Sequence, residues 1–403
     1  MVKGVPVVMF HGVGPNRAGF PWNHLFTPLH VFEEQMRALA EEGWKTISLE
    51  TLYRHMAEGT EIPEKSVVLT FDDGYLDNWV YAYPIIKRYG HHAVIWMSTD
   101  FVNPNPVVHP NLDDVRAGRV AESELEDRGY LSWEEMKRMI GDGTIEIQSH
   151  AKTHTWYFNS PEIIDFHRPR GVDGYVMPIW LAWNLFPERK YESMSVDFEG
   201  DVPYGTPIYA DGKSLAVRRY FEDRRLTERL VEFVSMKGGA AFFKEPRWRE
   251  RLEEIVDSFG PREDRTETEA EYEARVREEL SVSKETLERG LSVNVDFLCW
   301  PGGGRSEKTL EIAREVGYLA TTTHFYDPVR KNTYGQNPSE INRIGSSSPW
   351  TWHGRVLKET DGRFFTLGLE EFLERRSARW KLRFKKAYYI VRSSIKGGWE
   401  PLG

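Results

Sequence analysis

Short apolar runs recur along the first 150 residues of the chain and again after about residue 290. They carry few charges and are rich in β-branched residues, a pattern that is typical of buried strands. The predicted strands are Val5–Phe10, Thr46–Leu49, Val67–Phe71, Ala93–Met97, Ile145–Ser149, Val295–Cys299, Leu319–Thr323 and Glu340–Ile344.

Amphipathic stretches lie between these runs. Thr27-Pro28 has the form of an N-cap followed by a first-turn proline, and Ser132 with Glu135 forms a capping box. Pro84 falls near the middle of one stretch, where we expect it to kink the helix. The predicted helices are the segment from Thr27-Pro28 to Gly43, Leu52–Ala57, Asn78–Tyr89, the segment from Ser132 to about Gly141, and Ser306–Val316.

Strands that alternate with helices predict an α/β fold, with a parallel sheet or barrel covered by helices. In such folds ligands bind at the carboxyl ends of the strands. Four of the predicted strand ends carry residues that could take part in catalysis or binding. They are His11, the pair Asp72 and Asp73, the pair His150 and His154, and the Gly-rich turn that begins at Trp300.

Residues 155–290 interrupt this alternation. The first part is rich in aromatic residues, Pro and Gly and shows little periodicity, whereas residues 222–257 and 266–289 have helical character. A small-molecule amidase would not need such a block, so it favours a bulky substrate. The predicted organisation is a barrel from residues 1–154 and 291–350, a large and mainly helical insertion at 155–290, and a C-terminal extension at 351–403.

Composition narrows the function classes. The chain has 403 residues, of which 40% are hydrophobic and 29% charged, as in an ordinary globular protein of one elaborated domain or two. The formal net charge of −9 argues against nucleic acid as a partner. The only cysteine, Cys299, fits a reducing compartment, and we see neither a signal peptide nor an apolar run of about 20 residues. We therefore expect a cytoplasmic protein, and its oligomeric state is left open.

Asp72 and Asp73 follow an apolar strand directly, and Gly74 comes after them. Two adjacent carboxylates there are costly unless something pairs with them, because like charges in proximity raise one pKa. One interpretation is a polar turn, for which Asp-Asp-Gly is well suited. The other makes one Asp a metal ligand and its neighbour a general base.

His150 and His154 supply what the second interpretation needs. Their four-residue spacing allows both imidazoles to reach one ion. Two histidines and one carboxylate leave positions open for water and substrate, which suits Zn²⁺ or a similar divalent ion. Such an ion lowers the pKa of its bound water from 15.7 towards about 7, and the remaining Asp would take the proton from that water.

At these residues the chain resembles the polysaccharide deacetylases of the NodB-homology group, also called carbohydrate esterase family 4. Thr70–Gly74 matches the first family signature, TFDDG, and His150 with His154 matches the spacing of the second, although Ala151 replaces its small hydroxyl residue. The resemblance implies a distorted (β/α) barrel and metal-dependent removal of acetyl groups from glycans. It further implies that Asp72 is the general base and that Asp73, His150 and His154 bind the metal.

The order of the parts resembles the poly-N-acetylglucosamine deacetylases more closely than other branches. In that branch a His near the N-terminus acts as the general acid on the leaving amine, and His11 matches its position. The alternative for His11 is a structural residue at a strand end. The family's third motif carries an Arg that orients the base, and the corresponding CWPGGG here has none. We propose Arg343 as its substitute.

Further residues are candidates for substrate contacts. The family uses a backbone N–H just after the DDG segment to stabilise the oxyanion, here near Tyr75. Trp300 offers a ring for stacking on a sugar, and Gly302 and Gly303 would let backbone approach the substrate. The alternative for this segment is a tight turn between a strand and a helix.

The segment from Arg375 to Lys396 is strongly basic and interleaved with aromatic and aliphatic residues. On an acidic protein, such a segment is expected to contact an anionic membrane surface or a lipid-linked glycan. The alternative is a helix packed on the barrel with a solvated basic face.

The sequence alone is compatible with three functions. The first is a metal-dependent glycan N-deacetylase acting on an N-acetylhexosamine polymer or a lipid-linked sugar. The second is a hydrolase of another linear amide or acyl ester on the same fold. The third is a glycan-binding relative without catalysis, which the retained Asp72, Asp73 and His11 disfavour.

Overall fold

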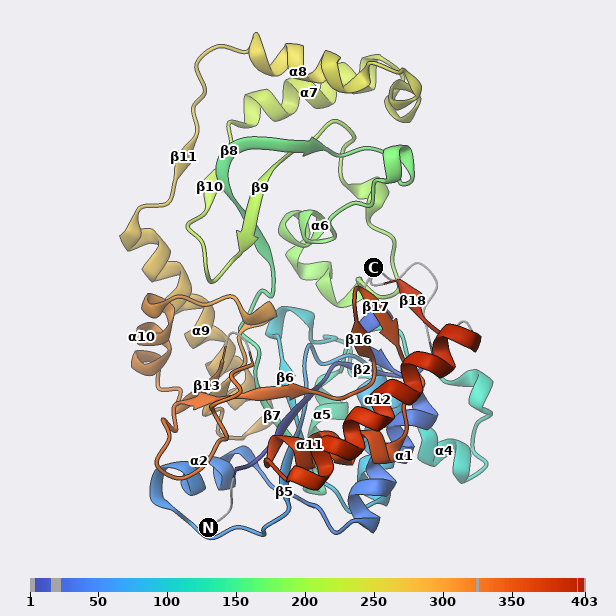
Figure 1. Cartoon of the computed structure of the whole chain (residues 1–403). Coiled ribbons are helices and arrows are strands. Elements are labelled where there is room, and N and C mark those ends of the chain that lie inside the picture. The colour runs from blue at the N-terminus through green and yellow to red at the C-terminus, as the bar shows by residue number, and fades with distance from the viewer. Residues whose placement is uncertain (1–3, 16–22, 324–325, 397, 402–403) are drawn as a thin grey trace. The chain divides into compact units, whose positions relative to one another are not determined.

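The computed structural model describes residues 4–15, 23–323, 326–396 and 398–401, and the chain divides into two units (Figure 1). The first unit, the barrel unit, consists of residues 1–152, 282–303 and 317–403. The second unit, the insertion unit, consists of residues 153–281 and 304–316. The C-terminal extension thus belongs with the barrel unit, whereas residues 304–316, expected in the barrel, belong with the insertion.

One parallel sheet forms the centre of the barrel unit. Its strands follow the order β14-β13-β12-β7-β6-β5-β1-β15, and the short β4 pairs with β5 beside this path. Among the described residues, the strand pairings in this sheet are all parallel, as the alternation of strands and helices predicts. The strands are β1 (Val7–Phe10), β4 (Lys45–Thr46), β5 (Ser66–Phe71), β6 (Ala93–Met97), β7 (Ile145–Ser149), β12 (Phe297–Leu298), β13 (Ala320–Thr322), β14 (Glu340–Ile341) and β15 (Arg343–Gly345).

The segment predicted as the single strand Glu340–Ile344 closes the sheet into a barrel. Its first part, β14, pairs with β13, and its second part, β15, pairs with β1 at the other end of the strand order. Because one residue, Asn342, separates the two parts, both edges of the sheet meet on the same stretch of chain. The predicted (β/α) barrel is therefore confirmed, with the closing strand split in two.

Helices cover the barrel, and two of them begin differently from the prediction. Ser48 caps α2 by accepting a hydrogen bond from the Thr51 N–H, so Leu49 starts a helix and does not end a strand. A π-helical turn ends at Ala82, and Pro84 then lies in the first turn of α3, where its missing N–H leaves no bond unmade. The helices here are α1 (Leu29–Glu41), α2 (Leu49–Glu58), α3 (Tyr83–Arg88), α4 (Leu112–Arg116) and α5 (Trp133–Gly141).

The C-terminal part of the barrel unit adds two helices and a small antiparallel sheet. The helix α11 (Gly362–Phe372) packs closely on α1, since a Cβ at Gly362 would lie 2.4 Å from the Glu34 carbonyl oxygen. The helix α12 (Arg376–Lys396) packs on α11. The sheet pairs β17 (Arg355–Leu357) with β16 (Trp350–Trp352) and with β18 (Glu400–Pro401).

The insertion unit contains a long strand pair that the sequence did not predict. β8 (Trp156–Phe166) pairs antiparallel with β9 (Pro207–Lys213), and register shifts interrupt the pairing on both sides of Ile163. A separate apolar cluster joins Phe166 of this pair to Leu230 and other residues of the helices that follow. The helices of the insertion unit are α6 (Trp180–Leu185), α7 (Arg224–Met236), α8 (Trp248–Asp257), the first half of α9 (Glu269–Leu291) and α10 (Glu307–Val316).

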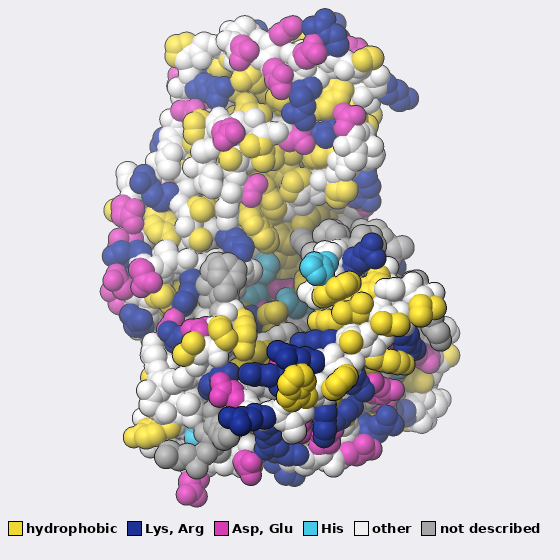
Figure 2. All heavy atoms as spheres, in the orientation of Figure 1, with side chains coloured by type: hydrophobic (Ala, Val, Ile, Leu, Met, Phe, Trp, Pro, Cys, Tyr) yellow, Lys and Arg dark blue, Asp and Glu magenta, His cyan; other side chains and the backbone are white. Residues whose placement is uncertain are grey.

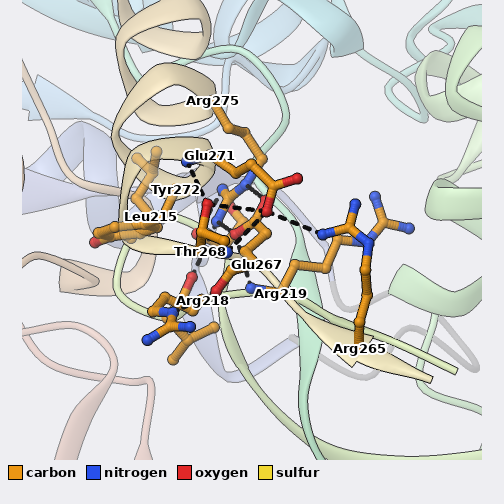
Figure 3. A network of polar contacts seen from close by, with 11 residues as sticks. Leu215, Arg218, Arg219, Arg265, Glu267, Thr268, Glu271, Tyr272 and Arg275 are labelled. Carbon is orange, nitrogen blue, oxygen red and sulfur yellow. Dashed lines mark hydrogen bonds and ion pairs between the residues drawn. The ribbon is translucent and has the colours of Figure 1, made fainter.

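A polar network fixes α9 to the strands of the insertion unit (Figure 3). Glu267, which is 3% exposed, accepts hydrogen bonds from the Arg275 guanidinium at 2.7 and 2.8 Å and from the Arg219 backbone N–H at 2.8 Å. Tyr272 donates a hydrogen bond to the Leu215 carbonyl oxygen at 2.7 Å. Glu267 lies just after β11 (Arg265–Thr266), which pairs with β10 (Tyr220–Phe221), so the buried pair joins strand and helix.

No helix among the described residues has both the length and the apolar character needed to cross a bilayer.

Candidate metal centre

Four of the five consecutive barrel strands from β12 to β1 are each followed by a residue of the candidate site. His11 follows β1, Asp72 follows β5, His150 follows β7 and Cys299 follows β12. Because the strands are parallel, their carboxyl ends share one edge, where barrel enzymes place their chemistry. The sequence prediction that these strand ends converge is confirmed.

Asp72 forms a two-point ion pair with Arg343. The guanidinium donates from Nη1 to Oδ1 at 2.6 Å and from Nη2 to Oδ2 at 2.9 Å. Asp72 is only 4% exposed, and Arg343 reaches it from the first residue of β15 across the intervening strand β1. Burial alone would raise the pKa of Asp72, but the Arg343 charge, assisted by His11, holds that pKa below its usual value. The carboxylate is thus kept ionised and fixed in orientation.

His150 is oriented by a backbone carbonyl. Its Nδ1 lies 2.8 Å from the carbonyl oxygen of Cys299, so Nδ1 carries the proton and donates it. Its other ring nitrogen, Nε2, faces the neighbouring carboxylate and lies 3.3 Å from Oδ1 of Asp73. The ring is 1% exposed. Metal-binding histidines are held in this way, by a hydrogen bond from the nitrogen that does not coordinate.

Asp73, His150 and His154 each offer a ligand atom, and these atoms lie within 4.8 Å of one another. Asp73 and His154 have positive φ angles of 75° and 39°, and Ala151 between the histidines has 58°. Such backbone is uncommon outside glycine and is found at sites where surrounding structure enforces it.

A second group of potential ligands consists of Asp72, His150 and Cys299. Both Asp72 oxygens already accept from Arg343, and the Cys299 sulfur lies 3.7 Å from Oδ2 of Asp72. Coordination by Asp72 would compete with this ion pair. The geometry therefore favours the set that contains Asp73 and His154, which a divalent ion such as Zn²⁺ would bind through one oxygen and two nitrogens.

His11 lies beside Asp72, and its loop is held by residues that the sequence analysis did not single out. The His11 Nε2 is 3.9 Å from Oδ2 of Asp72. Asn78 donates from its side-chain amide to the His11 carbonyl oxygen at 3.0 Å and to Oδ1 of Asp77 at 2.8 Å. Asp77 also accepts from the Val13 N–H at 3.0 Å. The only sequence signal was the position of Asp77-Asn78 shortly after the DDG segment.

Of the predicted substrate contacts, Tyr75 lies next to the centre. Burial and the neighbouring Asp73 carboxylate raise the pKa of its phenol well above the usual value. Trp300 is 1% exposed, so its ring lies beneath the surface, which favours a structural role over stacking on a sugar. Gly302 and Gly303 have φ angles of 53° and 73°, which fit the tight-turn alternative. Their contact with substrate stays a prediction.

Comparison with known families gives one family match. The family model described as polysaccharide deacetylase matches residues 59–167, which include the DDG segment and both histidines.

Two curated proteins are similar to parts of this chain. YxkH of Bacillus subtilis (strain 168) is 29% identical over 150 residues, which cover 37% of this chain and 43% of that protein. The poly-beta-1,6-N-acetyl-D-glucosamine N-deacetylase of Escherichia coli (strain K12) is 30% identical over 170 residues, which cover 40% of this chain and 22% of that protein. The chain thus spans less than half the length of these relatives.

Among solved structures, the BpsB deacetylase domain from Bordetella bronchiseptica aligns with 86% of this chain and 96% of its own, at 17% identity and a TM-score of 0.49. A de-N-acetylase from Aggregatibacter actinomycetemcomitans aligns with 84% of this chain and 94% of its own, at 16% identity and the same TM-score. The assignment of the barrel rests on the strand pairing described above.

Proposed function

We propose that this chain belongs to the polysaccharide deacetylase family, whose model matches residues 59–167, and that it removes N-acetyl groups from a glycan with the help of a divalent metal ion. The observation that carries the proposal is the placement of Asp73, His150 and His154 beside the ion pair of Asp72 and Arg343. The substrate class, an N-acetylhexosamine polymer or a lipid-linked sugar, is supported by the name of the Escherichia coli relative.

The donor set fits a divalent cation. Asp73 would contribute a carboxylate oxygen, His150 its Nε2 and His154 an imidazole nitrogen, and the hydrogen bond from Nδ1 of His150 leaves Nε2 as the ligand atom of that ring. Zn²⁺ is the ion that two histidines and one carboxylate suit best. When bound, such an ion makes water a better nucleophile near neutral pH and polarises the acyl carbonyl.

Asp72 acts as the general base in this proposal. Arg343 holds both of its oxygens and keeps it ionised, so it is ready to accept a proton from the attacking water. Arg343 is the positioning residue, in the place of the arginine that the third family motif lacks here. The adjacent Asp73 points its carboxylate towards His150, so in this proposal Asp73 binds the metal and Asp72 accepts the proton.

His11 acts as the general acid. After water has added to the carbonyl, the C–N bond breaks, and the leaving amine nitrogen needs a proton. His11 is less buried than Asp72 and lies on the same edge, with its loop fixed by Asn78. The backbone N–H near Tyr75 would donate to the developing oxyanion.

The test is acetate release from N-acetylglucosamine oligomers by the wild-type chain, by Asp72→Asn and by a surface control such as Asn105→Ala. We expect release by the wild type and the control, abolished by a chelator and restored by Zn²⁺, and none by Asp72→Asn. Full activity of Asp72→Asn would overturn its assignment as base. A metal-loaded wild type that is inactive on acetylated glycans, but cleaves another amide or ester, would overturn the substrate class.

A further inference from the structure

The outward side of α12 carries an uncovered apolar stripe. Five large apolar side chains on it are between 55% and 79% exposed, and they follow one another at intervals of three or four residues. These residues, which we call the α12 stripe, are Trp380, Phe384, Tyr388, Val391 and Ile395. Single exposed apolar residues are ordinary, but a row along one helix face marks an interaction surface.

The opposite side of α12 already has its partner. Ala378, Leu382 and Tyr389 are at most 3% exposed and pack with residues of α11 such as Phe364 and Leu367. The two apolar faces of the helix are therefore distinct. The inner face explains why α12 packs on α11. This packing does not explain why the outer face carries the apolar residues of the α12 stripe.

Basic residues flank the α12 stripe on both sides. At about 100° per residue, the five stripe residues fall within roughly 80° of the helix circumference. Arg376 and Arg383 lie along one border, and Lys381 and Arg392 lie along the other. All four are exposed, and α12 contains no Asp or Glu. Figure 2 shows apolar side chains set among Lys and Arg side chains over this part of the barrel unit.

We propose that α12 binds the surface of an anionic phospholipid membrane, with the α12 stripe between the headgroups and the flanking basic residues on lipid phosphates. Trp and Tyr are favoured at that depth, and Lys and Arg beside an apolar face are typical of helices that lie in the membrane plane. The inference refines the expected anionic contact of residues Arg375–Lys396, and it does not depend on the proposed catalytic function.

Charge decides between a membrane and a second copy of the chain. The α12 stripe alone would also suit an antiparallel or parallel helix pair, because its spacing resembles a coiled-coil seam. Two copies would, however, bring two helices together that carry only positive charge, and like charges next to a seam oppose pairing. An anionic surface satisfies both features of the helix at once.

The experiment uses the full chain in cosedimentation with phosphatidylcholine vesicles, with and without phosphatidylglycerol. We expect binding only to the anionic vesicles, and binding that weakens as salt increases. Phe384→Ser with Ile395→Ser should abolish it. Arg383→Gln and Arg392→Gln should each weaken it roughly fivefold.

The matched control is Met236→Ser, because Met236 is 70% exposed on α7 of the other unit. It should bind anionic vesicles as the wild type does, and all variants should keep the wild-type melting temperature. Equal sedimentation of Phe384→Ser with Ile395→Ser and the wild type would overturn the proposal. A wild-type protein that does not bind anionic vesicles would also overturn it. The same holds if the wild type shows no vesicle binding but forms dimers, and the double substitution dissociates these dimers.

Discussion

At the scale of single residues, Asp72 and Asp73 are neighbours in sequence with different surroundings. Asp72 is enclosed and held by Arg343, whereas Asp73 sits in left-handed backbone and faces His150. The left-handed turn points the two successive carboxylates to different partners. A guanidinium fork that matches both oxygens fixes a carboxylate better than a single ammonium can.

Arg343→Lys should therefore impair catalysis even though it keeps the positive charge. We expect kcat for acetate release to fall by about 10–100-fold, with KM nearly unchanged, because the lysine cannot hold both Asp72 oxygens. Arg343→Met should be worse and should move the acidic limb of the pH–rate profile upwards, since the charge that lowers the Asp72 pKa is lost. Unaltered kinetics in Arg343→Met would show that Arg343 serves stability alone.

The role of His11 is tested by the leaving group. His11→Ala should lower the rate on an N-acetyl glycan by about 10²–10⁴-fold, because the amine must be protonated as it leaves. An aryl acetate has a leaving group that needs no proton, so its hydrolysis should be affected far less. Equal losses on the two substrates would contradict the assignment of His11 as the acid. Asn78→Ala should show a weaker form of the same selectivity, since Asn78 only holds the His11 carbonyl.

Much of this site could be predicted from sequence, because its side chains stand at the ends of uncharged apolar runs. The supports could not be predicted. The Cys299 carbonyl that orients His150 belongs to a neighbouring strand 149 residues away, and backbone groups leave no residue-type signal. The aromatic ring of Trp300 makes it a candidate for stacking on a sugar, but sequence does not reveal that the ring is buried.

At the scale of elements, the barrel strands β6 and β7 and the helices of the insertion were predicted well, whereas the strands of the insertion were not. β6 has the predicted bounds because it is an apolar run that the sheet buries, and β7 has them although Glu146 and Gln148 interrupt its apolar residues. β8 contains Pro161 and polar residues and is mostly half-buried, so it shows neither an apolar run nor clear alternation. Its pairing with β9 is also interrupted by register shifts, which weakens any periodic signal.

Asp361 joins α11 to α12 and gives an element-scale prediction. It caps α11 through the Phe364 N–H at 2.7 Å, and its other oxygen accepts from Tyr389 at 2.8 Å and from Lys385 at 2.7 Å. Asp361→Ala should lower the local stability of this helix pair by about 1–2 kcal/mol. Hydrogen exchange in α12 measures it. Exchange as slow as in the wild type would contradict this role.

The same contacts predict the pH dependence of α12 docking. Burial alone would raise the pKa of Asp361, but Lys385, the Phe364 N–H and Tyr389 together hold it below the ordinary value of 3.8. A lowered carboxyl pKa stabilises the folded form fully above the ordinary value, and the contribution disappears as pH falls through the lower folded value. The protection of α12 amides against exchange, relative to their intrinsic rates, should fall on acidification below about pH 4 in the wild type and less so in Asp361→Asn.

At the scale of the whole molecule, the barrel unit depends on one short segment for its closure. Asn342, fully buried between β14 and β15, donates to the carbonyl oxygens of Asp327 and Arg330, both at 2.7 Å, and accepts from the Asp327 N–H at 3.0 Å. Asn332 in turn donates to the Val5 and Asn342 carbonyl oxygens. Sequence predicted a strand here, but only the pairing with both sheet edges shows that it closes the barrel.

Asn342→Ala should therefore destabilise the barrel unit by about 1–3 kcal/mol, because it leaves buried backbone groups without partners. Chemical denaturation followed by hydrogen exchange in β1 and β14 measures the change. The control is Asn337→Ala, an exposed residue of the same connection, for which we expect a smaller effect. Since Arg343 is the next residue, Asn342→Ala should also reduce acetate release. Equal stability of the two variants would mean that other contacts close the barrel.

The central claim is that Asp73 holds the ion while Asp72 does the proton transfer. It is tested most directly by the rate of acetate release from N-acetylglucosamine oligomers as a function of free Zn²⁺, for the wild type, Asp72→Asn and Asp73→Asn. We expect the wild type to saturate at low Zn²⁺, Asp73→Asn to need much more Zn²⁺ for any activity, and Asp72→Asn to stay inactive at every concentration. Rescue of Asp72→Asn by excess Zn²⁺, or wild-type metal dependence in Asp73→Asn, would contradict the account.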